Sequence, residues 1–507
     1  MKPAEGWNQR FHRRIIREVG YGLSLEGASA AAVRMFKEGS MSREMTMSGE
    51  MAMREMGMPG QMGNPGQMGN PGQMGRQGQM GRPEQMGSPE QMGMPQHNGG
   101  HLYIQTNETQ NFIIHFWRAA DGSITEADRT ATGGSGSGVF KPISGEESAP
   151  NAFEGADSVI LSPDRRFLYA TNGGDNSVSS FAVGEDGRLK LLDVCPTGNA
   201  VEGRSGTAKA LAFAPSTGML YVLHGFGPDH LRLMSVDGQG KLTPRPERYT
   251  VNTHNKFDRV PTMAQLSPDG RLLFVGTTWD EPPTANPDGS PVLWVLRAGR
   301  GPGFALKSIA SNAPDPDGLI VFPVIGDGTL GPAAFYDGRG ASPWNVRFLH
   351  SRPDTFIIGY AVGDGISIGH INANGTVSVG EVVKIDTSLG RPSELCWLSV
   401  SPDDRTVYAT NFGYGYITSF HVNGTTVAVA KDPACPRVRG DGTFRALCGD
   451  VSSGSSDSWI TADGAYLYQI YPNASKLVGY ETYQDGSLHE ITSARIPYNS
   501  PQGLAGW

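Results

Sequence analysis

One short pattern of apolar strands and tight turns returns seven times in the last four-fifths of this chain. Each copy ends with an Asp-Gly or Asn-Gly dipeptide between two strand-like runs. These dipeptides favour type I′ hairpin turns, in which both central residues have positive φ. The seven predicted turns are Asp121-Gly122, Asp186-Gly187, Asp237-Gly238, Asp327-Gly328, Asn374-Gly375, Asn423-Gly424 and Asp485-Gly486.

An apolar strand core precedes each turn, and most of these cores contain an aromatic residue. Several short strands per unit, repeated about every 50 residues, are typical of a β-propeller. We therefore predict an all-β, seven-bladed β-propeller. The seven cores begin at Leu102, Leu168, Leu220, Leu272, Phe356, Val407 and Leu467.

Each unit reads as strand A, a Ser-Pro-Asp type of turn, strand B, a loop, strand C, the glycine turn and strand D. The first unit lacks strand A, because the chain enters the domain at Leu102. The tail from Pro501 to Trp507 looks like the missing inner strand. We expect this C-terminal strand to close the ring beside Leu102–Thr106, which would remove an exposed sheet edge.

The first hundred residues differ in composition from the rest, and 16 of the 19 methionines lie there. We predict three parts: residues 1–58 with a short helix, residues 59–100 as a disordered tether, and residues 101–507 as the propeller. The tether carries a Met/Gly/Pro/Gln hexapeptide repeat that disfavours helices and central strands. Its thioethers could capture copper(I), or the repeat could bind nothing. We expect no metal or other cofactor in the propeller.

The charge pattern limits the classes of partner. The net charge is −8, and no basic stripe lies outside a short N-terminal cluster, so we expect no nucleic acid partner. No apolar run approaches the roughly 20 residues of a membrane-spanning helix. The first residues lack the apolar region of a secretory signal. We expect a soluble monomer. Because no secretory signal is found, we expect it in the cytoplasm, with an extracellular location as the alternative.

Two cysteines, Cys435 and Cys448, bracket a Gly- and Pro-rich loop. A disulfide between them would staple a protruding loop and indicate an oxidising compartment, whereas free thiols are the alternative. Cys195 and Cys396 lie in apolar strands and are expected to be buried free thiols. The loop also contains Arg439-Gly440-Asp441, which raises the hypothesis of a surface adhesion module.

The strand order places the longer D–A and B–C loops on one face, around the mouth of the central channel. Binding and catalytic groups usually lie on loops that a rigid scaffold holds. Cations and carboxylates there could bind an anion and supply an acid or base. His224, Glu281, Arg259 and Arg391 are the candidate catalytic residues. The ligand-face candidates are Asn107, Glu108, Lys209, Trp279, Asp280, Trp344, Arg347, Glu394 and Trp459, and the wider ring adds Asn172, Asp175, Asp258, Asn345, Asn411, Tyr414 and Asp457.

The second unit runs from Leu161-Ser-Pro-Asp through Leu168-Tyr-Ala-Thr-Asn to Asp186-Gly-Arg-Leu. It resembles the seven-bladed lactonase family, which includes 6-phosphogluconolactonase and 3-carboxymuconate cyclases, with repeats of the YVTN type. Leu395-Cys-Trp-Leu-Ser-Val-Ser-Pro-Asp and Gln502-Gly-Leu-Ala resemble a divergent branch of it. The resemblance spans residues 101–507 and implies the propeller fold and a metal-independent lactone hydrolase or cyclase.

The catalytic branch of that family implies Pro-Arg-His before one strand A and Asn-Glu after the matching strand B. No Pro-Arg-His occurs in this chain. The sixth unit has Arg391-Pro-Ser-Glu394 and then Asn411-Phe412, and only Asn107-Glu108 keeps the Asn-Glu ending. The main hypothesis is therefore a propeller that binds a small molecule, a glycan or a protein on its loop face. A lactone hydrolase with a rebuilt site is the first alternative, and adhesion is the second.

Overall fold

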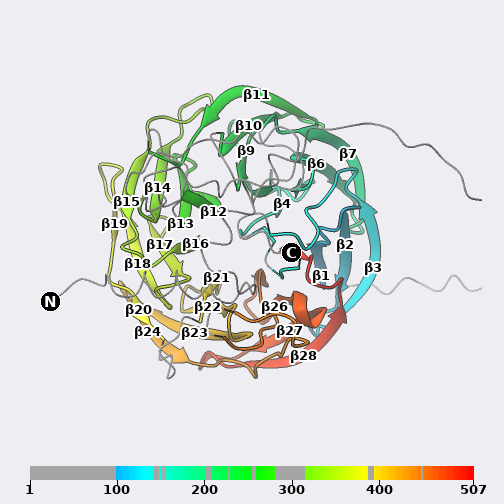
Figure 1. Ribbon diagram of the computed structural model, residues 1–507, viewed down its shortest axis with the longest axis vertical. Coiled ribbons are helices and arrows are strands. Elements are labelled where there is room, and N and C mark those ends of the chain that lie inside the picture. The colour runs from blue at the N-terminus through cyan, green and yellow to red at the C-terminus, as the bar shows by residue number, and fades with distance from the viewer. Residues whose placement is uncertain are drawn as a thin grey trace, which may run out of the picture. The chain divides into compact units, whose positions relative to one another are not determined.

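The computed structural model describes residues 99–141, 148–150, 152–153, 155–199, 207–225, 229–253, 259–279, 315–385, 393–446 and 449–507. Within this part, seven antiparallel sheets are arranged in a ring around a central axis (Figure 1). We call the region along this axis, which the inner strands face, the channel. The predicted seven-bladed, all-β propeller is confirmed. The predicted N-terminal helix and the repeat tether lie outside the described residues.

Each sheet is a blade whose strands follow one another from the channel to the rim. The fifth blade has an additional short strand, β20, that pairs with β18 beside β19. From the channel outward, the first blade has β29 Gln502–Gly506, β1 Gly100–Gln105, β2 Phe112–Arg118 and β3 Ile124–Ala131; the second has β4 Val159–Leu161, β5 Phe167–Asn172, β6 Ser177–Val183 and β7 Leu189–Pro196; and the third has β8 Ala208–Ala214, β9 Met219–His224, β10 Leu231–Val236 and β11 Leu242–Tyr249. The fourth blade has β12 Arg259–Leu266, β13 Leu272–Trp279, β14 Gly318–Pro323 and β15 Ala334–Asp337, and the fifth has β16 Pro343–Phe348, β17 Thr355–Tyr360, β18 Gly365–Ile371, β19 Val377–Val379 and β20 Val383–Lys384. The sixth blade has β21 Leu395–Val400, β22 Thr406–Asn411, β23 Tyr416–Asn423 and β24 Thr426–Lys431, and the seventh has β25 Ser458–Ile460, β26 Tyr466–Tyr471, β27 Lys476–Thr482 and β28 Leu488–Arg495. A short 3-10 helix, Pro472–Ala474, joins β26 to β27.

The C-terminal strand closes the ring as predicted. β29 pairs antiparallel with β1, and Tyr103 lies opposite Ala505. The first blade thus takes its inner strand from the end of the chain and the other three from the beginning of the domain. Closure leaves no blade without its inner strand.

The glycine turns do not have the predicted type I′ geometry. In five blades the glycine alone has positive φ, and its N–H donates to the carbonyl three residues earlier, as Gly122 does to Ala119 (3.0 Å). This is a type I turn followed by a left-handed glycine. The aspartate keeps negative φ because its carboxylate accepts the N–H two residues on, as Asp121 does from Ser123. At Asp237-Gly238 the turn glycine is Gly240 instead.

The A–B turns share a side-chain network that explains the Ser-Pro-Asp signature. Ser162 donates its hydroxyl to Asp164 (2.6 Å) and accepts the N–H of Phe167 (3.0 Å). The same bonds recur in three further blades, with Thr461 replacing serine in the last. The signature therefore encodes a turn and not a binding site.

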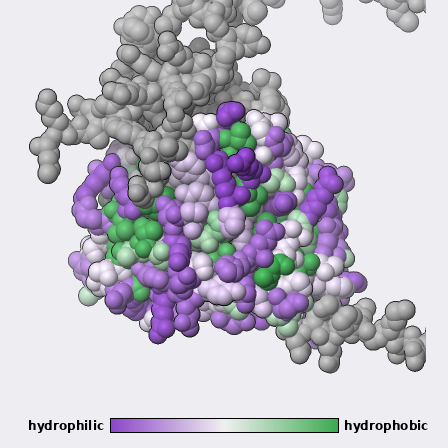
Figure 2. Space-filling view, turned by 90° about the horizontal axis from the view of Figure 1, so that it is seen from below, coloured by the Kyte–Doolittle hydropathy of each residue, from purple (hydrophilic) through white to green (hydrophobic). Residues whose placement is uncertain are grey.

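The core lies between neighbouring blades. Apolar side chains of strands A, B and C pack face to face there, and the strand-B tyrosines are buried among them. The rim seen from the side of β24 and β28 is mostly hydrophilic with small hydrophobic groups (Figure 2). The ring is thus stabilised by blade-to-blade burial, which leaves the channel and the loop face for function.

Candidate functional site

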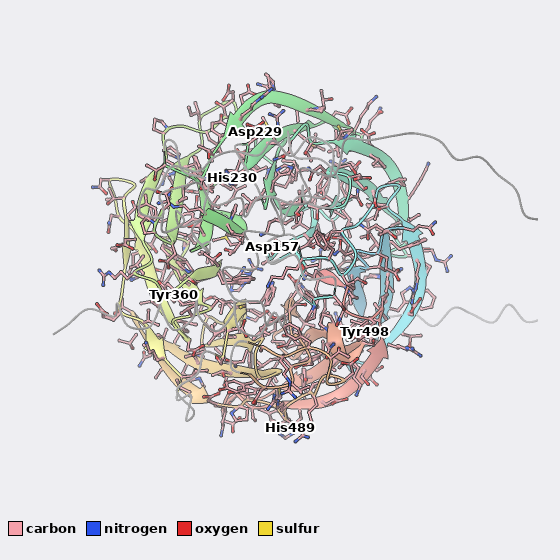
Figure 3. All side chains as sticks on the ribbon, in the orientation of Figure 1. Asp157, Asp229, His230, Tyr360, His489 and Tyr498 are labelled. Carbon is pink, nitrogen blue, oxygen red and sulfur yellow. The ribbon has the colours of Figure 1, made fainter. Side chains whose placement is uncertain are left out.

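Charged groups from three blades meet at the central channel. Asp157 lies two residues before β4, Asp457 directly precedes β25, and Arg347 is on the inner strand β16. Asp157 lies near the centre of the ring (Figure 3). Because the inner strands of all blades surround one axis, residues 190 and 300 positions apart come together. We call Asp157, Arg347 and Asp457 the channel triad.

Arg347 and Asp157 form a bidentate ion pair. Nη1 and Nη2 of Arg347 lie 2.9 and 2.7 Å from the two carboxylate oxygens of Asp157, and Nη1 also donates to Gln265 (3.2 Å). The two side chains keep 23% and 21% of their surface exposed. Burial by itself lowers the pKa of Arg347, but the charge and hydrogen bonds of Asp157 raise it. The guanidinium is therefore a fixed positive charge beside solvent-accessible space.

Asp457 is the buried member of the triad, with 4% of its surface exposed. Its Oδ2 accepts the N–H of Gly503 (2.9 Å), and the backbone N–H of Asp157 also donates to this carboxyl. Burial raises the pKa of Asp457 to about 7, and the charge of Asp157 adds to this, while Arg347 and the hydrogen bonds oppose it. This carboxyl can therefore take up or release a proton near neutral pH.

The connection between β3 and β4 carries Asp157 across the end of the channel. Ala156 donates its N–H to Thr262 of the fourth blade (2.9 Å), and Trp397 of the sixth blade donates to the carbonyl of Gly155 (3.2 Å). Asp157 itself has a φ of +66°, which is unusual for a residue other than glycine. The strained backbone is held by bonds to several blades, a feature often found where a side chain must be placed for function.

The candidates from the sequence include Arg347 and Asp457 but not Asp157. The signal was available, because Asp157 stands just before an inner strand, as Asp457 does. What the sequence does not reveal is the path of the β3–β4 connection, which brings this loop aspartate into the channel.

The candidate base His224 is fully buried in the third blade. Its Nε2 lies 2.8 Å from the hydroxyl of Thr197, and its Nδ1 lies 3.2 Å from the carbonyl of His230. Burial lowers the pKa of His224 to about 3. Both ring nitrogens are thus occupied within the blade, and this geometry argues against His224 as a base for a substrate in the channel.

Arg259 is also committed to the fold. Its Nε and Nη1 donate to the carbonyls of Pro316 (2.9 Å) and Val251 (2.7 Å), and its guanidinium lies 4.2 Å from the ring of Phe335. Asp315, almost fully buried, lies 3.9 Å away. Arg259 therefore ties the third blade to the fourth rather than joining the channel triad.

The predicted aromatic mouth is not assembled from Trp344 and Trp459. Trp344 is 6% exposed and packs edge-on against Trp397. Trp459 is half-buried and stacks on Tyr468. The side chain of Trp279 is outside the described residues. Among the aromatic candidates that the structure describes, none offers a widely exposed ring.

The remaining candidates are dispersed. Asn107 is buried and accepts the N–H of Ser137 (2.9 Å), whereas Glu108 is exposed. Lys209 is buried beside Gly155, and Glu394 is half-buried with a φ of +56°. The candidates Asp280, Glu281 and Arg391 lie outside the described residues.

The structure does not contain the predicted disulfide at Cys435. Cys435 is a buried free thiol close to the hydroxyls of Tyr471 and Tyr480, and burial raises its pKa. Cys448 lies outside the described residues. Cys195 and Cys396 are buried free thiols, as expected.

Within the described ranges, no group of three or more His, Cys, Asp or Glu side chains is placed to hold a metal ion. No helix in the same ranges is long and apolar enough to cross a membrane. The channel triad is the candidate site, because it joins a partly exposed ion pair to a buried carboxyl whose pKa is about 7.

Comparison with known proteins supports the fold. The family "Lactonase, 7-bladed beta-propeller" matches residues 93–252, which cover the first three blades. A search of curated proteins gave no significant match.

Three examples from the many solved structures that match illustrate the shared fold. A candidate 6-phosphogluconolactonase from Bacteroides uniformis superposes with a TM-score of 0.55 at 15% identity and covers 80% of this chain and 99% of its own. The periplasmic gluconolactonase of Pseudomonas aeruginosa gives 0.54 at 14% identity, covering 80% and 98%. A protein from Lactobacillus plantarum gives 0.54 at 13% identity, covering 81% and 99%. The chain is therefore a lactonase-like seven-bladed β-propeller, matched by the family over its first blades and sharing its fold around the ring.

Proposed function

We propose that this propeller hydrolyses lactones at the channel triad. The observation that carries the proposal is a linked set of charged groups: Arg347 is paired with Asp157, and the backbone N–H of Asp157 donates to Asp457, whose pKa is about 7. A pair of carboxyl groups whose environments differ, beside a fixed cation, is a common arrangement for acid–base chemistry. The lactonase-like fold and the gluconolactonase name of one structural neighbour support this class of reaction.

In this proposal Asp457 is the general base. Its carboxylate takes a proton from a water molecule while the water oxygen bonds to the lactone carbonyl carbon. Arg347 stabilises the negative charge that develops on the carbonyl oxygen. The bond between the carbonyl carbon and the ring oxygen then breaks, and Asp457 returns its proton to that oxygen. The product is a hydroxy acid, so atoms and protons balance.

Asp157 would position Arg347. The bidentate pair fixes the plane of the guanidinium, and the backbone N–H of Asp157 also holds Asp457. One residue thus orients both the cation and the base. This site does not use the Arg-His and Asn-Glu motifs that the family resemblance implies. The proposal is therefore that the active site is rebuilt from other residues.

A second candidate function is ligand binding without turnover. It is favoured by the burial of Asp457, which is 4% exposed, whereas the Arg347 side chain is 23% exposed. A ligand could then contact the ion pair of Arg347 and Asp157 without reaching the proposed base, and no chemistry would follow.

Lactone turnover by the purified full chain tests the proposal. A pH-indicator assay would use 6-phosphogluconolactone, glucono-1,5-lactone and a muconolactone. Arg347→Gln and Asp457→Asn should each reduce kcat/KM by at least about 100-fold. Arg405→Gln, on an exposed turn, is the matched control and should have no effect. Binding that Arg347→Gln abolishes, with no turnover, would favour the second candidate. No turnover and no binding would reject both.

A further inference from the structure

A pocket of 550 Å³ lies on the loop face, away from the channel. It is formed between the long connection from β24 to β25 and the turn that precedes β27, and it extends to β28. β27 and β28 are the third and fourth strands from the channel. Tyr498, which lines the pocket, lies over the seventh blade and well away from Asp157 (Figure 3). The pocket is therefore a separate site from the channel triad.

The walls of this pocket are fixed by hydrogen bonds. Asn473 accepts the N–H of Asp441 (3.1 Å) and donates to the hydroxyl of Tyr498 (3.1 Å). A Cβ on Gly440 would lie 2.1 Å from the carbonyl oxygen of Ser452, so the loop packs tightly at this point. Such a pocket is preformed, and a ligand would meet little ordering cost.

Two exposed cations in the pocket have no charged partner among the residues that the structure describes. Arg439 and Lys476 line it and make no ion pair or side-chain hydrogen bond within the described residues. The neighbouring Arg437, in contrast, is paired with Asp450 (3.0 Å). Free Arg and Lys side chains in a pocket are suited to bind a carboxylate or phosphate.

The pocket also offers hydrogen-bond acceptors. Asp441 and the exposed Glu490 line it together with the two cations. Two carboxylates would repel a multiply charged ligand such as a polyphosphate or a nucleic acid. They would accept hydrogen bonds from hydroxyl groups, so the combination fits a ligand with one negative charge and several hydroxyls.

Tyr498 adds an aromatic surface. Its ring is 42% exposed, and its hydroxyl is fixed by Thr443 (2.6 Å) and Asn473. A ring held at its polar end is a rigid platform for the apolar face of a sugar. We propose that this pocket binds an acidic saccharide, that is, a sugar whose carboxylate contacts Arg439 and Lys476 while its hydroxyls contact Glu490 and Asp441.

Calorimetric titration of the full chain with galacturonic acid, a sugar with a single carboxylate, tests this proposal. The comparison ligands are its methyl ester, which lacks the charge, and inorganic phosphate, which lacks the sugar. Arg439→Gln and Lys476→Gln should each weaken binding by about tenfold or more. Lys190→Gln, an exposed lysine on β7, is the control and should bind as the unmodified chain does. Tyr498→Phe should keep the ring platform but loosen it, and Tyr498→Ala should weaken binding further.

Each outcome decides the proposal. Saturable binding of galacturonic acid that Arg439→Gln and Lys476→Gln weaken, with little binding of the ester, supports it. Equal binding of the ester, phosphate binding as strong as saccharide binding, or no binding at millimolar concentration would overturn it. Because the channel triad is untouched in these variants, lactone turnover should stay unchanged, and failure here would leave the proposed hydrolysis unaffected.

Discussion

Buried carboxyl groups occur at several places in this ring, and their surroundings separate structural roles from a functional one. Burial raises the pKa of Asp364 to about 7, as it does for Asp457. Asp364, however, accepts the N–H and hydroxyl of Ser393 (2.7 and 2.9 Å) and joins two blades. Asp457 instead accepts the backbone N–H of Asp157, whose ion pair with Arg347 is partly exposed. The partners, more than the pKa, identify the candidate site.

Asp457 should make stability depend on pH. Its folded pKa of about 7 lies above the ordinary value, so the folded protein keeps a proton that the unfolded chain releases above about pH 4. Stability should therefore fall as pH rises from about 4 to 7. In Asp457→Asn this fall should be smaller. Between pH 5 and pH 7.5, the unfolding free energy of the variant should therefore rise by about 1–3 kcal/mol relative to that of the unmodified protein.

Urea unfolding of both proteins at pH 5 and pH 7.5 measures this difference. A difference that does not change between the two pH values would show that Asp457 titrates normally, and the acid–base role would lose its basis.

At the scale of the elements, strand B of several blades carries a tyrosine that reaches the next blade. Tyr221 donates to the carbonyl of Gly328 (2.8 Å), and Tyr468 donates to Gly122 (2.6 Å). Each acceptor is the glycine of a C–D turn in the neighbouring blade. The repeated tyrosine and the repeated glycine turn of the sequence are thus two ends of one hydrogen bond between blades.

Tyr221→Phe should reduce stability by about 1–2 kcal/mol, because a buried carbonyl loses its donor. Tyr169 is the matched control: it occupies the same place in the second blade, but its buried hydroxyl has no hydrogen-bond partner within the described residues. Tyr169→Phe should leave stability unchanged or raise it slightly. Thermal unfolding of both variants checks the pair, and equal losses would contradict an inter-blade role of the hydrogen bond.

Prediction from the sequence was most successful for the strands and their order around the ring. Alternating apolar runs and glycine turns repeat in every blade, so the number of blades and the closing strand followed from periodicity. The predicted type I′ geometry of the glycine turns was wrong. The preference of Asp-Gly for that turn type does not take into account that the aspartate carboxylate accepts the N–H of the residue two positions later. The sequence could not show that Asp157 lies in the channel or that His224 is fully buried, because loop paths and burial depend on contacts between distant blades.

The whole molecule is a closed ring, and one glycine links its closure to the channel triad. Gly503 on β29 has a φ of +77°, and a Cβ there would lie 2.3 Å from the hydroxyl of Ser158 and 3.0 Å from the N of Val159. Its N–H is the donor to Asp457. The last strand therefore completes the first blade and holds the proposed base at the same time.

Gly503→Ala should destabilise the ring by about 2 kcal/mol or more, since it combines an unfavourable φ with a clash. Gly375→Ala is the control: it has a φ of +80° but open space around it, and should cost only the conformational part, about 1–2 kcal/mol. Urea unfolding compares the two variants. A smaller loss at Gly503 than at Gly375 would show that closure tolerates rearrangement.

The pH dependence of lactone hydrolysis tests the central claim most directly. We would measure kcat/KM for 6-phosphogluconolactone or another lactone that is turned over, from pH 5 to 9, after subtracting the spontaneous reaction. The channel triad predicts that kcat/KM rises with pH to a plateau with a midpoint of about 7, and that Asp457→Asn abolishes this rise. Turnover no faster than the spontaneous rate, or the same profile in Asp457→Asn, would contradict the account.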